Sequence, residues 1–358
     1  MPVLSDTTIT FDRLKNFIQQ ALTAAGLPEA DAATVAALMA QADLQGSDGH
    51  GVSRLPQYVR RIKAGGFNVR PNIRIVQEHA GTAVLNGDNG MGHLVMKRAA
   101  EMAVEKARTT GIGWVNSQFS NHAGPASLYA TMPLAHDMIG LYFAVGNANH
   151  LPPWGGLDML LSTNPIAAAI PADEEQPIVL DMATTVAAYG KVKTKALRGE
   201  TMPEGWMIDR EGKPLTDPKR ADQGMLLSLG GMEAGYKGYG LAMIIGLLAG
   251  TLGGAAMGRD VIDFNHDDGS VTNTGQAVAA INVAAFGDVA TFKQSVDALV
   301  RDFRGSQRIP GVERIWVPGE RSHETRLKRT SHGIPVAPAL LRGLDQVADD
   351  LRISRLVS

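Results

Sequence analysis

The sequence predicts an α/β fold with a mixed sheet, and three observations support this prediction. Apolar residues switch between helical and strand spacing along most of the chain, so helices and strands interleave. The chain has 358 residues, 44% of them hydrophobic, which is enough for two domains or one large α/β unit. No low-complexity linker or internal repeat divides it, so we expect interwoven lobes instead of two lobes joined at one hinge.

The N-terminal part of the chain predicts three helices. Thr10 is a suitable N-cap for the first helix, and Gly26 is a suitable stop. Pro28 opens the second helix, whose first turn carries acidic residues that suit the helix dipole. The expected spans of the three helices are 11–25, 28–45 and 52–63.

Strand patterns begin after the third helix and are separated by further helices. The expected strands cover residues 73–76, 82–85, 112–115, 138–145, 166–170, 178–180 and 314–317. The other expected helices cover residues 91–108, 125–137 and 288–304 and the C-terminal segment. Turn-forming residues predict a turn at 86–90 and a hairpin at 206–215.

One uncharged segment, residues 238–258, is long enough to span a bilayer. Its many glycine residues make it less hydrophobic than a typical membrane span, and the rest of the chain has no comparable segment. It therefore predicts a helix buried in a large core, and no membrane partner is expected.

Composition excludes several classes of function. The chain has no cysteine, which excludes disulfides, thiolate catalysis, zinc ribbons and iron–sulfur clusters. Its net charge is −2 and it has no basic block, so broad binding to nucleic acid is not expected. The N-terminus has no basic patch followed by an apolar core, so the expectation is a cytoplasmic location.

The common nucleotide-binding motifs are missing. Gly-x-Gly triplets occur four times, but none has the third glycine of a dinucleotide fingerprint, and no Walker A loop is present. If the protein binds a nucleotide, it does so by another route. Lys237 lies at the start of the long apolar helix, where a lysine and flexible backbone can receive a phosphate.

The most informative segment is residues 43–58. His50 follows a predicted helix C-terminus, where the dipole favours the protonated imidazole. Arg54 and Tyr58 follow four and eight residues later and can share a face with His50. A proton donor beside a guanidinium is what a reaction on a carboxylate-bearing carbonyl or imine needs. The alternative is a helix–turn–helix corner whose histidine caps a carbonyl.

A second candidate is His122, which follows an apolar strand and precedes a helix, the usual place for site residues in open α/β sheets. The alternative is an ordinary turn histidine. Two acidic and histidine clusters, one around Asp48 and one at 266–268, lack the paired histidines of a metallohydrolase, so no metal site is expected.

Residues 43–58 resemble the DLxGxDSHGxxRxPxY signature of the malate/L-lactate dehydrogenase family that lacks a Rossmann fold. This family includes sulfolactate, ureidoglycolate and diketogulonate enzymes and the piperideine/pyrroline-2-carboxylate reductases. The resemblance spans nearly the whole chain in order. It continues through Ser120-Asn121-His122, Pro153-Trp154-Gly155-Gly156, Thr163-Asn164-Pro165, Leu180-Asp181-Met182-Ala183-Thr184-Thr185, Gly190-Lys191, Lys237-Gly238-Tyr239-Gly240-Leu241, Pro318-Gly319-Glu320 and Gly333-Ile334-Pro335.

The resemblance implies a mixed-sheet, non-Rossmann oxidoreductase that uses NAD or NADP, acts on a small-molecule carboxylate and forms a homodimer. It implies one catalytic unit over residues 1–345, followed by a C-terminal tail over 346–358. It also implies that His50 donates or accepts a proton, that Arg54 holds the substrate carboxylate and that His122 shares the acid/base role. Tyr58 is grouped with Arg54 as a substrate-binding residue. The implied cofactor-binding residues are His122, Asp181, Met182, Ala183, Thr184, Lys237, Gly319 and Glu320.

The expected reaction is reversible hydride transfer between a nicotinamide and C2 of a small 2-hydroxy or 2-oxo acid. The alternative within the family is reduction of a cyclic imine, in which relatives use a serine before the signature histidine to assist the proton relay. This chain has Gly49 at that position. Outside the family, the alternatives are a hydrolase or lyase that uses His50 with Asp48, and a non-catalytic binder of anionic metabolites.

Overall fold

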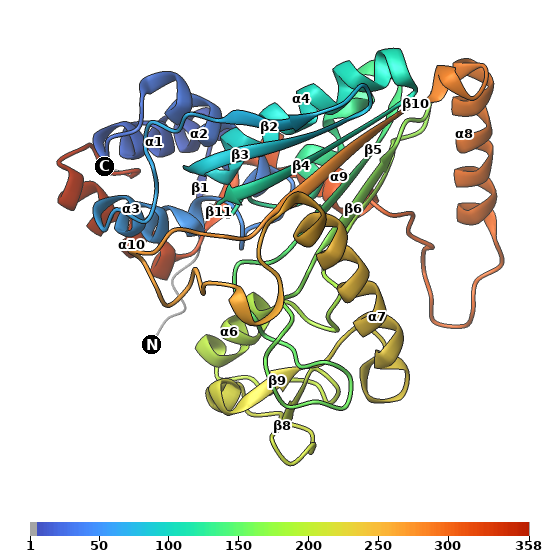
Figure 1. Cartoon of the computed structure of the whole chain (residues 1–358). Coiled ribbons are helices and arrows are strands. Elements are labelled where there is room, and N and C mark those ends of the chain that lie inside the picture. Colours follow the sequence, from blue (N-terminus) through green and yellow to red (C-terminus); the bar gives the residue numbers. More distant parts are fainter. Residues whose placement is uncertain (1–5, 358) are drawn as a thin grey trace.

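A computed structural model describes residues 6–357, although nothing is described of the side chains of residues 193, 194, 197 and 198. At its centre is a seven-stranded sheet (Figure 1). Its strands, in spatial order, are β2 (Arg74–Glu78), β3 (Thr82–Gly90), β4 (Ile112–Ser120), β10 (Gln276–Asn282), β5 (Met138–Ala144), β6 (Ile166–Ile170) and β7 (Ile178–Met182). Only β3 and β4 pair in parallel, and all the other pairs are antiparallel. The predicted mixed sheet is therefore confirmed.

Helices cover both faces of this sheet. α4 (Gly92–Thr110) packs its small buried residues against β3, β4 and β10. α7 (Gly231–Ala249) packs against β5 and β10. Neighbouring residues of β5 show that the two faces differ, because Tyr142 belongs to the core under α4 and Phe143 to the core under α7.

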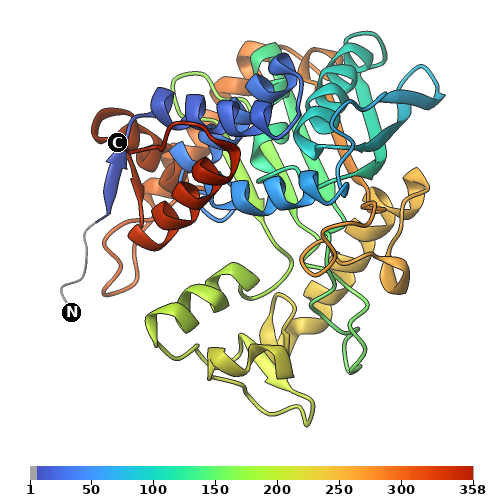
Figure 2. The ribbon, with the colours of Figure 1, turned by 90° about the vertical axis from the view of Figure 1, so that its left-hand side faces the viewer.

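Both ends of the chain meet in one helical layer beside the sheet (Figures 1 and 2). This layer contains α1 (Phe11–Ala24), α2 (Glu29–Leu44), α3 (Leu55–Lys63) and α10 (Pro338–Leu351). A short strand, β1 (Thr7–Ile9), pairs antiparallel with β11 (Ile334–Val336) and fastens the two ends together. The three predicted N-terminal helices are confirmed, with a 3₁₀ turn, η1 (Val52–Arg54), in front of α3. α10 continues past residue 345, where the predicted C-terminal tail begins, and Val347 and Ala348 are buried in this layer.

A smaller lobe lies below the sheet in the views of Figures 1 and 2. It contains α6 (Tyr189–Arg198), β8 (Met207–Asp209) and β9 (Gly224–Leu226). The hairpin predicted at 206–215 is confirmed, because Ile208 and Pro214 form an antiparallel bridge and the Leu215 N–H donates to the Met207 carbonyl. β8 also forms an antiparallel ladder with β9, which the sequence did not predict. The remaining helices are α5 (Ser127–Ala130), α8 (Val289–Gly305), α9 (Glu320–His332) and the 3₁₀ segments η2 (Met132–His136), η3 (Pro218–Gln223), η4 (Thr251–Gly253), η5 (Gly258–Asp260) and η6 (Val283–Ala285).

Four predictions about elements are corrected. The turn expected at 86–90 lies inside β3, where Asp88 and Asn89 adopt positive φ without ending the strand. The helix expected at 125–137 is split into α5 and η2, because Pro133 cannot continue the ladder of helical hydrogen bonds. The strand expected at 314–317 is an irregular segment that leads into α9.

The fourth correction concerns the long apolar segment. α7 ends at Ala249, and one of its faces is not buried in the chain, because Met243, Ile244 and Leu247 are exposed. None of the helices described is long and apolar enough to cross a membrane.

Candidate active site

A cavity of about 1060 Å³ lies between the N-terminal helical layer, the edge of the sheet and α9. Sequence reasoning predicted eleven site residues, and the structure brings seven of them to the wall of this cavity. These are His50, Arg54, His122, Asp181, Met182, Ala183 and Gly319. The other four do not line it: Tyr58, Thr184, Lys237 and Glu320.

The loop between α2 and α3 carries His50 into the cavity. At Gly51 a Cβ atom would lie 2.2 Å from the carboxyl carbon of Asp43, so only glycine fits there. The Asp43 carboxyl group accepts a hydrogen bond of 2.7 Å from the Val52 N–H. From α9, the Arg329 guanidinium pairs with Asp48 and donates to the Asp43 carbonyl. The loop is thus held from both ends of the chain.

The imidazoles of His50 and His122 are joined by a hydrogen bond. His50 Nδ1 lies 3.1 Å from His122 Nε2, and the two ring planes are 8° apart. The other nitrogen of His122, Nδ1, lies 2.5 Å from the Tyr58 hydroxyl. The two predicted catalytic histidines therefore form one unit, with Tyr58 behind it.

Both histidines are neutral at ordinary pH. Burial and then the nearby Arg54 guanidinium lower the pKa of His50 to about 4. Burial also holds the pKa of His122 well below its ordinary value, with further contributions from Arg54, His50 and His93. The sequence predicted that the helix dipole would favour protonated His50, and this is wrong for the ligand-free chain because desolvation outweighs the dipole.

Arg54 presents hydrogen-bond donors to the cavity. Its Nε donates to the Gly49 carbonyl at 2.8 Å, and its Nη1 donates to Gln57 Oε1 at 3.1 Å. These bonds fix the guanidinium plane, while Nη2 has no hydrogen-bond partner among the described side chains and backbone groups. A fixed guanidinium edge with free donors suits a carboxylate.

An aromatic wall closes the site behind His122, and sequence reasoning missed it. Phe264 packs 6.0 Å from the His122 ring and 6.4 Å from the Tyr58 ring. The buried Arg61 stacks on Phe264 and donates to the backbone carbonyls of Phe264, Asp267 and Ser270. No local pattern predicts this contact, because about two hundred residues of chain separate the partners.

The second cluster considered for metal, at residues 266–268, lies in the loop that Arg61 holds. Among the side chains that the structure describes, no three histidine or acidic residues are grouped so that they could hold a metal ion.

On the opposite wall, Asp181 and Gly319 come from β7 and the turn before α9. The Asp181 carboxylate accepts a hydrogen bond of 2.8 Å from the Ser127 N–H, and desolvation raises its pKa. Gly319 has φ of 98°, a conformation that favours glycine, and a Cβ there would lie 3.0 Å from the Val179 nitrogen.

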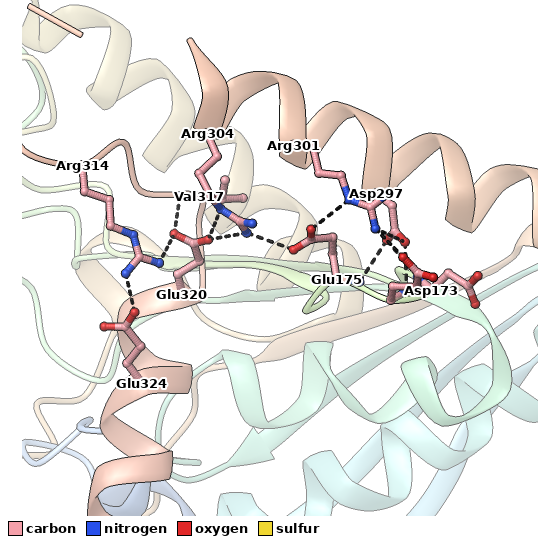
Figure 3. Close-up of polar contacts among 10 residues, drawn as sticks. Asp173, Glu175, Asp297, Arg301, Arg304, Arg314, Val317, Glu320 and Glu324 are labelled. Atoms are coloured by element: carbon pink, nitrogen blue, oxygen red, sulfur yellow. Dashed lines mark hydrogen bonds and ion pairs between the residues drawn. The ribbon is translucent and has the colours of Figure 1, made fainter. Parts of the chain in front are cut away.

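Glu320 supports this turn from outside the cavity (Figure 3). Its carboxylate accepts from the Val317 N–H at 3.1 Å and pairs with Arg304 at 2.7 Å and Arg314 at 3.2 Å. Arg304 also pairs with Glu175 at 3.0 Å, so the network joins α8, the turn and the loop after β6. Glu320 is therefore committed to positioning the turn.

Two other predicted cofactor residues also lie elsewhere. The Thr184 hydroxyl is buried and donates to the Thr163 carbonyl at 2.9 Å. Lys237 is an exposed residue of α7. α9 brings the cationic side chains of Arg321 and Arg326, together with His323, to the cavity wall. The sequence shows these residues as a basic stretch but does not show which face of the helix meets the cavity.

Known proteins of one family resemble the chain over nearly its whole length. A family model described as malate/L-lactate dehydrogenase matches residues 9–345. Malate dehydrogenase from Pyrococcus horikoshii is 37% identical over 96% of each chain, and L-sulfolactate dehydrogenase from Methanocaldococcus jannaschii is 36% identical over 95% of this chain and 96% of its own. A solved structure of malate dehydrogenase from Entamoeba histolytica superposes with a TM-score of 0.93 at 30% identity, covering 98% of this chain and 99% of its own.

Other relatives widen the range of chemistry. The NAD⁺-dependent ureidoglycolate dehydrogenase of Escherichia coli is 32% identical over 92% of each chain. A Δ1-pyrroline-2-carboxylate/Δ1-piperideine-2-carboxylate reductase of Pseudomonas putida is 31% identical over 95% of this chain and 96% of its own.

Proposed function

The chain belongs to the malate/L-lactate dehydrogenase family, and we propose that Arg54, His50 and His122 bind and turn over a small 2-oxo or 2-hydroxy acid in its cavity. Membership makes the protein an NAD(P)-dependent oxidoreductase that acts on CH–OH or C=N groups. One observation supports the proposal most strongly. The Arg54 guanidinium, which has free hydrogen-bond donors, and the His50–His122 pair line the same cavity.

The residues present fit a nicotinamide dinucleotide. The cavity has the volume for an extended ligand, and the cationic side chains of Arg321 and Arg326 suit its phosphates. Asp181, Met182, Ala183 and Gly319 would complete the cofactor site. When bound, the cofactor supplies or accepts the hydride.

His50 moves the proton. When a 2-oxo acid is reduced, C2 gains a hydride, the C–O π bond breaks, and the oxygen takes a proton from Nε2 of protonated His50, which is left neutral. In the oxidation the same nitrogen takes the hydroxyl proton. A substrate carboxylate on Arg54 offsets the charge that helps to depress the pKa of His50, so binding raises that pKa towards its ordinary value.

The family alternative is reduction of a cyclic imine such as the substrates of the Pseudomonas putida relative. We favour the 2-oxo acid because Gly49 provides no hydroxyl next to His50. The hydrolase and lyase alternatives need Asp48 beside His50, but Asp48 pairs with Arg329 of α9.

A panel of 2-oxo acids and cyclic imines, followed at 340 nm with NADH and with NADPH, tests the proposal. We expect turnover with a 2-oxo acid. Cofactor fluorescence separates the remaining classes, because a hydrolase, lyase or simple metabolite binder leaves NAD(P)H emission unchanged. Absence of both turnover and cofactor binding would contradict the proposal.

We also propose that the protein is a homodimer that buries the exposed face of α7. The face is apolar at helical spacing, through Tyr236, Met243, Ile244 and Leu247, which are 53%, 37%, 50% and 42% exposed. Exposed apolar residues gathered on one helix face are typical of a protein–protein interface.

A further inference from the structure

A chain of hydrogen bonds runs from the cavity into the core of the protein. It begins at His50 Nδ1, passes through both nitrogens of His122 and ends at the Tyr58 hydroxyl. Tyr58 is fully buried, with the rings of Phe67, Phe264 and His93 around it. It therefore reaches the reaction only through His122.

The direction of these hydrogen bonds follows from one backbone group. The Gly124 N–H points at Nδ1 of His122 at 3.4 Å, and a backbone N–H can only donate. Nδ1 of neutral His122 is therefore the acceptor, and the Tyr58 hydroxyl donates to it. In the reverse arrangement two N–H groups would face each other, and the hydroxyl hydrogen would have no acceptor among the described residues.

The same logic fixes the rest of the unit. With Nδ1 unprotonated, neutral His122 carries its proton on Nε2 and donates it to His50 Nδ1. Neutral His50 must then carry its proton on Nε2. That nitrogen has no hydrogen-bond partner among the groups that the structure describes, and His50 lines the cavity.

We propose that Tyr58, together with the Gly124 N–H, is a positioning residue that fixes the tautomer of His122 and so makes His50 a hydrogen-bond donor towards the cavity. The inference rests on the proposed function, since the group that receives this bond is the C2 oxygen of the substrate. A donor that is already oriented favours binding of the 2-oxo acid, because its C2 carbonyl oxygen can only accept a hydrogen bond.

The Tyr58 hydroxyl also stabilises the His50–His122 pair when the pair carries an extra proton. In the neutral pair only Nδ1 of His122 neither carries nor accepts a ring proton, so a third proton must go there in spite of the nearby Gly124 N–H. The Tyr58 hydroxyl then turns from donor to acceptor. Phenylalanine can do neither. Hydrogen bonds to a charged group are about twice as strong as neutral ones, so the hydroxyl stabilises the protonated pair more than the neutral pair. The titratable and charged groups that face His122 are His50, Arg54, Tyr58 and His93.

The test is ¹⁵N NMR of the full-length, ligand-free protein labelled at histidine, because the shifts of the two ring nitrogens distinguish the tautomers. His50→Gln and His122→Gln assign the signals. We expect both histidines as Nε2–H tautomers in the wild type and a mixture at His122 in Tyr58→Phe. The wild-type spectrum alone decides the tautomer, even if Tyr58→Phe fails to fold. His122 with its proton on Nδ1 would overturn the inference.

Kinetics give the second measurement. Tyr58→Phe should lower kcat for 2-oxo acid reduction about three- to tenfold, the value of one hydrogen bond, without changing KM for NAD(P)H. Its profile of kcat against pH should move to lower pH. Tyr129→Phe is the matched control, because it removes a buried hydroxyl that bonds the Ala123 carbonyl and no imidazole. An unchanged pH profile in Tyr58→Phe, or an equal shift in both variants, would contradict the proposed role.

The spectra need neither substrate nor cofactor. If the tautomers are as expected but no 2-oxo acid is turned over, the proposed function fails and the assignment of the histidine pair stands. If turnover is found with the opposite tautomer, only the inference about Tyr58 fails.

Discussion

At the scale of single residues, the short motifs predicted side chains that line the cavity but not the partners of these side chains. His50, Arg54 and His122 were identified from local patterns and lie on one cavity. Tyr58 shares the helical spacing of Arg54 yet points into the core, because Phe67, Phe264 and His93 surround its ring. Spacing along a helix predicts a shared face, and only the packing of distant segments decides what that face meets.

Asp43 gives a prediction about stability. Burial raises its pKa from 3.8 to about 8, although the bond from Val52 N–H opposes this. Between these values the folded chain holds a proton that the unfolded chain has lost, so this group makes stability fall as pH rises. Asp43→Asn keeps an acceptor for Val52 and does not titrate. The free energy of unfolding, measured with urea, should fall less between about pH 5 and about pH 8 in Asp43→Asn than in the wild type. The difference between the two proteins should be up to about 1 kcal/mol per pH unit. If the variant and the wild type lose the same free energy of unfolding between the two pH values, Asp43 does not release a proton on unfolding.

Gly49 gives a prediction about substrate choice. An added Cβ would meet nothing within 4 Å, so the loop has room for a side chain. Gly49→Ser should fold as well as the wild type and restore the hydroxyl that family reductases carry beside the histidine. We expect the ratio of cyclic-imine to 2-oxo acid turnover to rise, with Gly49→Ala as the control for bulk alone. Equal ratios in both variants would show that the hydroxyl has no part in the choice.

At the scale of elements, apolar periodicity and capping residues predicted most helices and strands. The errors lie in segments whose residue types favour one element while their tertiary contacts impose another. The residues Asn86 to Gly90 are typical of a turn, yet β3 continues through them beside β4. Trp316 and Val317 are apolar and were expected in a strand, but they line the cavity, and Glu320 holds Val317 in an irregular turn. Tertiary contacts outweigh propensity in both segments.

α9 is the element whose role was not predictable, and it carries a prediction about the cofactor. Arg326 lines the cavity, whereas Lys328, two residues later, is exposed and does not line it. If phosphates of NAD(P)H bind beside Arg326, Arg326→Glu should weaken cofactor binding at least tenfold in a fluorescence titration. Lys328→Glu makes the same charge change and should have little effect. A similar loss in both variants would indicate a general electrostatic effect instead of a contact.

At the scale of the whole molecule, the mixed sheet was predictable from the order of elements, but the exposed face of α7 was not. The interwoven lobes stay a prediction. An uncharged helix predicts burial, and a single sequence does not distinguish burial in the same chain from burial in a second one. The division at residue 345 and the cytoplasmic location stay predictions.

The proposed dimer is tested by placing a charge on that face. Ile244→Glu should convert the dimer into a monomer in multi-angle light scattering, because an unpaired carboxylate would be buried at the interface. Leu299→Glu changes an exposed leucine of α8 and is the matched control. A wild-type monomer, or a dimer that persists in Ile244→Glu, would contradict the assignment of this surface.

The most direct measurement is a comparison of steady-state kinetics for His50→Ala and Arg54→Ala with the 2-oxo acid that the panel identifies. Loss of the proton donor should lower kcat by about 10²–10⁴ and leave NAD(P)H binding intact. Loss of the guanidinium should weaken substrate binding by about 2–5 kcal/mol, seen as a raised KM, again with the cofactor still bound. Equal loss of NAD(P)H binding in both variants, a wild-type kcat in His50→Ala or a wild-type KM in Arg54→Ala would contradict the proposed roles of the two residues.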